Sequence, residues 1–141
     1  MHSEHLQNVS FVWVVLGWFV AVAATSIGVV ALAAAGIMDT DGTPAVWAVL
    51  CVAIGFWIGG YMTGTRDIEA PILHGIGIGL TSLLAWFLLN VVVALSAAEG
   101  QWVSLSPVTT AALLLLQMVA AVAGAWVADR RALRGQSLTG D

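Results

Sequence analysis

Residues 59–79, GGYMTGTRDIEAPILHGIGIG, decide how this chain folds, because they hold the only charged side chains between residues 42 and 98. Arg66, Asp67 and Glu69 lie close together there, with glycines on both sides. A short polar segment between two long apolar segments is typical of a connection between two membrane-spanning helices. We therefore expect the chain to turn at Arg66 and to cross a membrane before and after it.

The composition is that of an integral membrane protein. Of 141 residues, 60% are hydrophobic and 9% are charged, and the mean hydropathy of +0.99 is far above that of soluble domains. Membrane lipid is therefore an expected partner. Eight acidic side chains against four arginines give a net charge of -4, which excludes the basic footprint of a nucleic-acid-binding protein.

Four apolar segments predict an all-α, polytopic bundle of four transmembrane helices. They cover about residues 11–35, 44–63, 68–98 and 107–132, and about 20 residues suffice to cross a hydrocarbon core of roughly 30 Å. Thr43-Pro44 and Ser106-Pro107 each combine a capping residue with a proline at the first helical position. Residues 1–10 form a polar lead, and residues 133–141 are expected to be a mobile polar tail.

The two halves of the chain resemble each other. A shift of 64 residues lays Gly60 on Gly124 and Arg66 on Arg130. One interpretation is a pair of repeated helix hairpins related by an axis along the membrane normal. The other is chance agreement within a biased composition.

Small residues at four-residue spacing predict where helices approach closely. Glycine removes the side chain at a position where another helix backbone lies, so such pairs are typical of helix contacts in membranes. The expected packing positions are Gly55, Gly59, Gly60, Gly64, Gly75 and Gly79.

The pattern Gly59-Gly60-Tyr61-x-Thr63-Gly64, followed by His74-Gly75, resembles one in small four-helix membrane proteins of bacteria and archaea. In those proteins a Gly-Gly-aromatic-x-small-Gly motif precedes a short cytoplasmic turn, and His-Gly opens the next helix. The resemblance covers about residues 55–80. It implies a four-helix bundle and, because those proteins have no assigned activity, it implies no function.

No complete catalytic, cofactor or metal constellation can be assembled from the sequence, so we expect a protein that is not an enzyme and holds no cofactor. The polar residues expected at the cytoplasmic interface are Arg66, His74, Asp129 and Arg130. An imidazole at the position of His74 could carry protons or bind a metal or tetrapyrrole. The alternative, which we favour, is a structural hydrogen bond beside Gly75. Asp129 is expected to pair with Arg66 or Arg130.

Four polar side chains are expected at one level, roughly 10–15 Å below the external boundary, when residues are counted from the outer helix ends. They are Ser26, Cys51, Asn90 and Gln117. Because a carboxamide that faces lipid leaves donors and acceptors unpaired, Asn90 and Gln117 should turn inward and bond across the bundle. A small hydrated site for an ion or ligand is the alternative.

The arginines set the expected orientation. All four arginines fall on one side of the membrane, namely Arg66, Arg130, Arg131 and Arg134. The positive-inside rule places that side, and with it both termini, in the cytoplasm. The expected location is the plasma or inner membrane. We expect a structural or accessory subunit that assembles with itself or with a larger membrane complex through its glycine-rich faces. The alternative is a small oligomeric transporter or channel.

This orientation can be tested with single cysteines in a Cys51→Ala background. An impermeant thiol reagent applied to intact cells should label Thr40→Cys and Ser104→Cys, and it should leave Ser3→Cys and Ser137→Cys unlabelled. Labelling of Ser137→Cys in intact cells would reverse the assignment.

Overall fold

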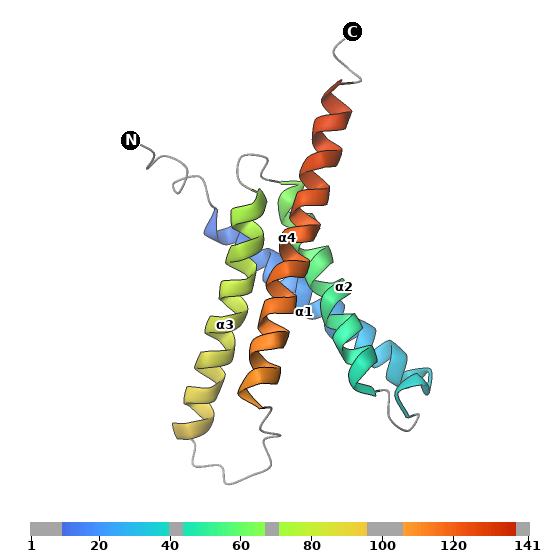
Figure 1. Ribbon diagram of the computed structural model, residues 1–141, viewed down its shortest axis with the longest axis vertical. Coiled ribbons are helices and arrows are strands. Elements are labelled where there is room, and N and C mark those ends of the chain that lie inside the picture. The colour runs from blue at the N-terminus through green and yellow to red at the C-terminus, as the bar shows by residue number, and fades with distance from the viewer. Residues whose placement is uncertain (1–9, 40–43, 67–70, 96–105, 138–141) are drawn as a thin grey trace.

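The structure, a computed structural model, is all-helical and packs four long helices as a bundle (Figure 1). It describes residues 10–39, 44–66, 71–95 and 106–137, and no strand occurs among them. The helices are α1 (Phe11–Ala34), α2 (Pro44–Gly64), α3 (Pro71–Leu95) and α4 (Pro107–Ser137), with a short 3-10 helix η1 (Ile37–Asp39) after α1. All four long helices are apolar enough to cross a membrane. The predicted four-helix bundle is confirmed, and the chain is a multi-pass membrane protein.

Local chemistry explains several helix ends. The backbone N–H of Thr109 donates to Ser106 Oγ at 3.1 Å, so Ser106 caps α4, which starts with Pro107. At the end of α1, Gly36 has a φ of 70° and donates its N–H to the Ala33 carbonyl at 3.0 Å. The other expected cap, Thr43, lies outside the described residues.

The fourth helix is longer than predicted. It continues through Ser137, whereas we expected it to end at 132 and to be followed by a mobile tail. Residues 129–134 explain the difference, because alanine, leucine and arginine favour helix and Arg134 lies in the last turn, where a cation stabilises the helix terminus. A fall in hydropathy marks the membrane boundary, and a helix can continue beyond it into water. The expected ends of α3 at 68 and 98, the lead at 1–9 and residues 138–141 lie outside the described part of the chain.

One face of α2 packs against α1 through its first pair of glycines. A Cβ on Gly55 would lie 2.7 Å from the Ala21 carbonyl oxygen, and one on Gly59 would lie 2.8 Å from Ala21 Cβ and would collide with the Gly17 carbonyl oxygen. These distances are shorter than any side chain tolerates, so the two backbones are in direct contact here.

The opposite face of α2 packs against α4 through its second pair. A Cβ on Gly60 would collide with the Ala121 backbone, and one on Gly64 would lie 2.6 Å from the Ala125 carbonyl oxygen. From α4, a Cβ on Gly124 would collide with the Trp57 carbonyl oxygen. The second helix is therefore held between α1 and α4, and adjacent glycines serve different neighbours.

These contacts follow the 64-residue shift. Gly60 meets Ala121 and Gly124 meets Trp57, and adding 64 to Gly60 while subtracting 64 from Ala121 converts the first contact into the second. In addition, Trp18 and Ser82, which are 64 residues apart, share a hydrogen bond between α1 and α3. Such reciprocal contacts are those of a two-fold axis that passes between α2 and α4. They support the interpretation as two repeated hairpins.

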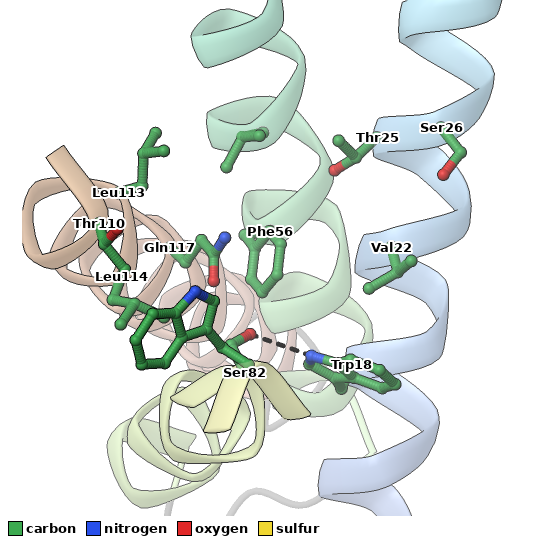
Figure 2. Close-up of a pocket in the computed structure, with 12 residues that line it drawn as sticks. Trp18, Val22, Thr25, Ser26, Phe56, Ser82, Thr110, Leu113, Leu114 and Gln117 are labelled. Atoms are coloured by element: carbon green, nitrogen blue, oxygen red, sulfur yellow. Dashed lines mark hydrogen bonds between the residues drawn. The ribbon is translucent and has the colours of Figure 1, made fainter. Parts of the chain in front are cut away.

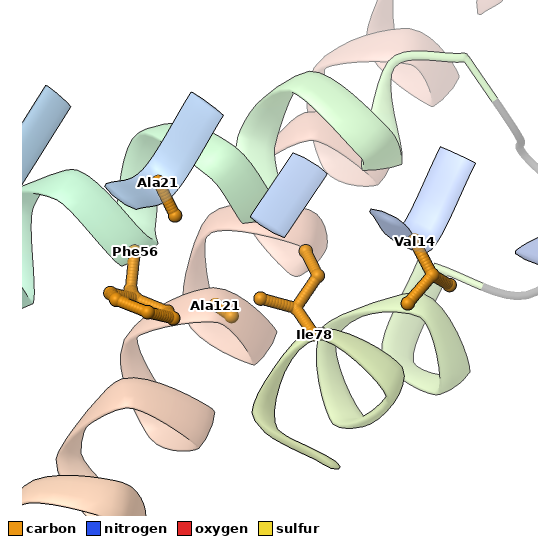
Figure 3. Packing of buried hydrophobic residues seen from close by; sticks show 5 residues of the cluster. All are labelled: Val14, Ala21, Phe56, Ile78 and Ala121. Carbon is orange, nitrogen blue, oxygen red and sulfur yellow. The ribbon is translucent and has the colours of Figure 1, made fainter. Parts of the chain in front are cut away.

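Helix α3 joins the bundle through α4. A Cβ on Gly75 would lie 2.7 Å from Val122 Cα, and one on Gly79 would lie 2.7 Å from Met118 Cβ. Because the helix backbones lie so close together, the core between them is small. Its buried hydrophobic cluster takes residues from all four helices (Figure 3), namely Val14, Ala21, Phe56, Ile78 and Ala121.

The bundle is tight at one end and splayed at the other. We call one end of the bundle the arginine end. There α1 begins, Arg66 follows the end of α2, and α4 carries Arg130. From there, the α1–α2 hairpin and the α3–α4 hairpin diverge toward the opposite end (Figure 1). Cys51 and Thr110 are the only buried side chains described within residues 26–35, 44–54, 83–92 and 106–116. The opposite halves of the helices therefore have few neighbours within the chain.

The backbone contact between α2 and α4 predicts a sharp difference between two glycines. We expect Gly60→Ala to lower the free energy of unfolding in detergent by about 1–3 kcal/mol, because its methyl group would meet the Ala121 backbone. In the matched control Gly28→Ala, the new Cβ lies 3.1 Å from the Cys51 Sγ, a side-chain atom that can move. That variant should stay within about 1 kcal/mol of the parent, the scale of the helix propensity difference. Equal losses in both variants would show that the crossing is not a close contact.

Candidate functional site

A groove opens between the two hairpins, where they begin to diverge. Its volume is about 280 Å³, and all four helices contribute to its walls. Most of the lining surface is apolar, and Val52 and Phe56 from α2 and Leu113 and Leu114 from α4 contribute to it. The polar residues of the lining are Trp18, Thr25, Ser26, Ser82, Trp86, Thr110 and Gln117 (Figure 2).

Two of these polar groups are satisfied within the chain. The indole Nε1 of Trp18 donates to Ser82 Oγ at 3.0 Å and so links α1 to α3 across the groove (Figure 2). The hydroxyl of Thr25 donates to the Ala21 carbonyl oxygen one turn earlier, at 2.8 Å. Back-bonding of this kind satisfies a hydroxyl inside a membrane helix at little cost.

Gln117 is different. Its Oε1 is buried and accepts no hydrogen bond from any residue that the structure describes. Figure 2 shows the Gln117 carboxamide in the groove beside Phe56, an apolar ring that is itself 3% exposed. A buried carbonyl oxygen without a donor loses the hydrogen bonds that water would give it. The wall of the groove therefore contains a buried acceptor that no described residue satisfies.

The expected polar level is only partly assembled. Ser26 and Gln117 line the same groove, but Cys51 lies outside its lining, buried next to Gly28. Asn90 is exposed, and its Nδ2 donates to the Trp86 carbonyl oxygen of its own helix at 2.8 Å. The prediction that both carboxamides turn inward was wrong for Asn90.

Asn90 does not bond across the bundle because the two hairpins diverge near it. Ser82, Trp86 and Asn90 follow one another at four-residue spacing along one stripe of α3. Ser82 and Trp86 line the groove, and Asn90 lies one turn beyond it, where α1 and α2 have moved away. Counting residues gives the depth of a side chain and does not say whether a neighbouring helix is still opposite it.

His74 lies one turn inside α3 at the arginine end, and its side chain is packed among the helices. Its side chain is fully buried, and with Ile78 and Thr63 it is among the three largest fully buried side chains described. The cause is the close approach of α4 to Gly75, which covers this turn of α3. His74 is thus part of the packed arginine end and lies outside the groove.

The arginines of this end lie over aromatic rings. The guanidinium carbon of Arg66 is 5.4 Å from the centre of the Trp13 ring, and that of Arg130 is 3.8 Å from the centre of the Trp126 ring. Pairing of either arginine with Asp129 had been expected. Arg130 follows Asp129 directly and so points to another side of α4, whereas Trp126 is four residues earlier on the same face.

Arg131 completes this belt of cations and rings. Its guanidinium carbon lies 5.6 Å from the centre of the Tyr61 ring, and its Nη1 donates to the Tyr61 hydroxyl at 3.4 Å. This contact ties the end of α4 to α2. Aromatic side chains and arginines are typical of a membrane interface, where one part of each group is apolar and the other is hydrated.

The bond between Trp18 and Ser82 was not among the predictions, although the sequence contains a signal for it. Their separation of 64 residues equals the shift that aligns the two halves. Equivalent residues of a two-fold repeat can meet at the axis, so the repeat itself predicts candidate pairs. Elsewhere, the described residues contain no group of three His, Cys, Asp or Glu side chains that could hold a metal ion.

No protein-family model, no curated protein and no solved structure matches this chain. The resemblance at residues 59–75 to small four-helix membrane proteins therefore stays a prediction.

Proposed function

We propose that this chain is a non-enzymatic, structural or accessory membrane protein that assembles in the bilayer, first of all with a second copy of itself. The observation that carries the proposal is the exposed carboxamide of Asn90 on α3. The surface involved is the exposed part of α3 around Asn90, which includes Leu83 and Phe87 at the preceding turns.

Asn90 has hydrogen-bonding capacity left over. One N–H of its carboxamide is used by the Trp86 carbonyl, which leaves the second N–H and the side-chain oxygen. The neighbours Phe87 and Val91 are exposed apolar side chains, as expected for a surface in contact with hydrocarbon. An unpaired amide is unfavourable in that environment, and a second carboxamide would supply both a donor and an acceptor.

The glycine-rich faces, which the sequence suggested for assembly, are not the surface that we propose. Gly55, Gly59, Gly60 and Gly64 all approach helices of the same chain. Gly75 and Gly79 likewise approach α4. Glycines that are filled by internal contacts cannot also receive a partner helix.

A small oligomeric transporter or channel is the second candidate, and the groove is the observation in its favour. Polar side chains reach it from α1, α3 and α4 near the middle of the membrane. However, the described residues that line the groove include no ionisable side chain, which an ion or proton pathway would be expected to contain. The accessory function therefore accounts better for the site.

The proposed location is the inner or plasma membrane, with the arginine end in the cytoplasm. Arg66, Arg130 and Arg131 each lie over an aromatic ring at that end. The one-sided placement of the arginines supports this orientation through the positive-inside rule.

Assembly through Asn90 can be tested by comparing Asn90→Leu with the parent protein. Interhelical hydrogen bonds in membranes contribute about 1–2 kcal/mol in model peptides, so we expect the dissociation constant of the dimer in micelles to rise about tenfold. Native mass spectrometry across a concentration series measures it. Asn90→Gln, which keeps the carboxamide, should retain most of the affinity.

Cross-linking locates the same contact. In a Cys51→Ala background, Phe87→Cys should form an intermolecular disulfide in membranes treated with a mild oxidant, and Asn90→Leu should reduce its yield. Ile27→Cys, an equally outward position on α1, serves as the control and should cross-link weakly. A monomer at all concentrations, or equal cross-linking at both positions, would contradict the proposal.

A further inference from the structure

We propose that the groove between the hairpins binds a neutral, largely apolar molecule whose hydroxyl group donates a hydrogen bond to Gln117 Oε1. This ligand class comprises alcohols with a long hydrocarbon tail, whether an isoprenoid alcohol, a fatty alcohol or an acylglycerol. The inference is independent of self-assembly, because the groove is built within one chain.

The requirement for a donor comes from Gln117. Its Oε1 is buried and receives no hydrogen bond from the described residues, although a hydroxyl donor from Ser82 is present in the same groove. The Ser82 oxygen accepts from Trp18 Nε1 at 3.0 Å, and the Ser82 hydroxyl makes no hydrogen bond to Gln117 Oε1. A ligand that brings its own O–H supplies the missing donor and removes the cost of a buried, unpaired carbonyl oxygen.

The requirement for neutrality comes from depth and from the lining. Gln117 lies roughly 15 Å along α4 from its first residue, which places it near the middle of a hydrocarbon core. No described lining residue can carry a charge that would balance a charged ligand. A carboxylate, phosphate or ammonium head would therefore enter at a high cost in solvation.

The groove is large enough for a hydrocarbon tail and too small for a partner helix. An α-helix with its side chains is about 10 Å across, so the groove volume of about 280 Å³ holds less than one turn of it. A hydrocarbon chain is thinner and can leave through the open side between the hairpins. Val22, Val52, Leu113 and Leu114 supply the apolar wall that such a chain would contact.

Brominated probes test this in the full-length protein, reconstituted in phosphatidylcholine nanodiscs. The probes are 11-bromoundecanol, its methyl ether and 1-bromoundecane, and bromine quenches tryptophan fluorescence on contact. Trp86 lines the groove and reports occupancy, so the quenching should fall in Trp86→Phe. In the parent protein, we expect the alcohol to bind about tenfold more tightly than the methyl ether, which has the same tail and no donor.

Substitutions of Gln117 test whether its Oε1 is the acceptor that gives the preference for the alcohol over the ether. Gln117→Leu and Gln117→Met, which fill the same space without an oxygen, should bind alcohol and ether equally. Asn90→Leu removes the other carboxamide of the described membrane spans, outside the groove, and should keep the tenfold preference per protomer. Thermal melts confirm that each variant is folded before it is compared.

Three results would overturn the inference. The first is equal binding of alcohol and ether to the parent protein, as expected if water or a lipid chain already occupies the groove. The second is a loss of preference in Asn90→Leu as large as that in Gln117→Leu. The third is alcohol quenching that Trp86→Phe leaves unchanged. None of these depends on whether the protein is a monomer or a dimer, so the failure of self-assembly would leave the test intact.

Discussion

The contact of the α2 backbone with the α4 backbone at Gly60 and Gly124 is the constraint on which the rest of the structure depends. Inside a membrane, lipid tails are as apolar as the side chains, so helices associate through close packing and hydrogen bonds. At this crossing neither helix has space for even one methyl group on its glycine. Because α2 also touches α1, and α4 also touches α3, the one crossing holds both hairpins together.

A single tight crossing also explains why the bundle opens. Small residues draw the helices together at the arginine end, where His74 and Ile78 are fully buried. Straight helices that cross at an angle must separate away from the crossing, and the hairpins do so toward the opposite end (Figure 1). The groove lies at the start of that separation, and the exposed stripe of α3 lies beyond it. Packing at one end thus creates the two surfaces to which we assign binding and assembly.

The two membrane carboxamides show how position decides the role of a chemical group. Gln117 faces a groove with apolar walls, where its buried oxygen favours a small ligand with a donor. Asn90 bonds to its own helix and is exposed beyond the groove, where its remaining groups favour another protein chain. Both follow from the rule that polar atoms in hydrocarbon need partners. What differs is the space that the fold leaves next to each one.

The sequence by itself determined four apolar helices, the start of two of them at Pro44 and Pro107, and glycines as the residues of closest approach. Only the tertiary structure decided which helix each glycine meets, that Asn90 is exposed and that His74 is buried. The reason is that these helices are apolar on every side, so they lack the polar face that would reveal their rotation from sequence. High hydropathy marks only the part of a helix that lies inside the membrane, so it did not predict the continuation of α4 to Ser137. Length and depth are encoded locally, whereas rotation and neighbours depend on the packing of all four helices.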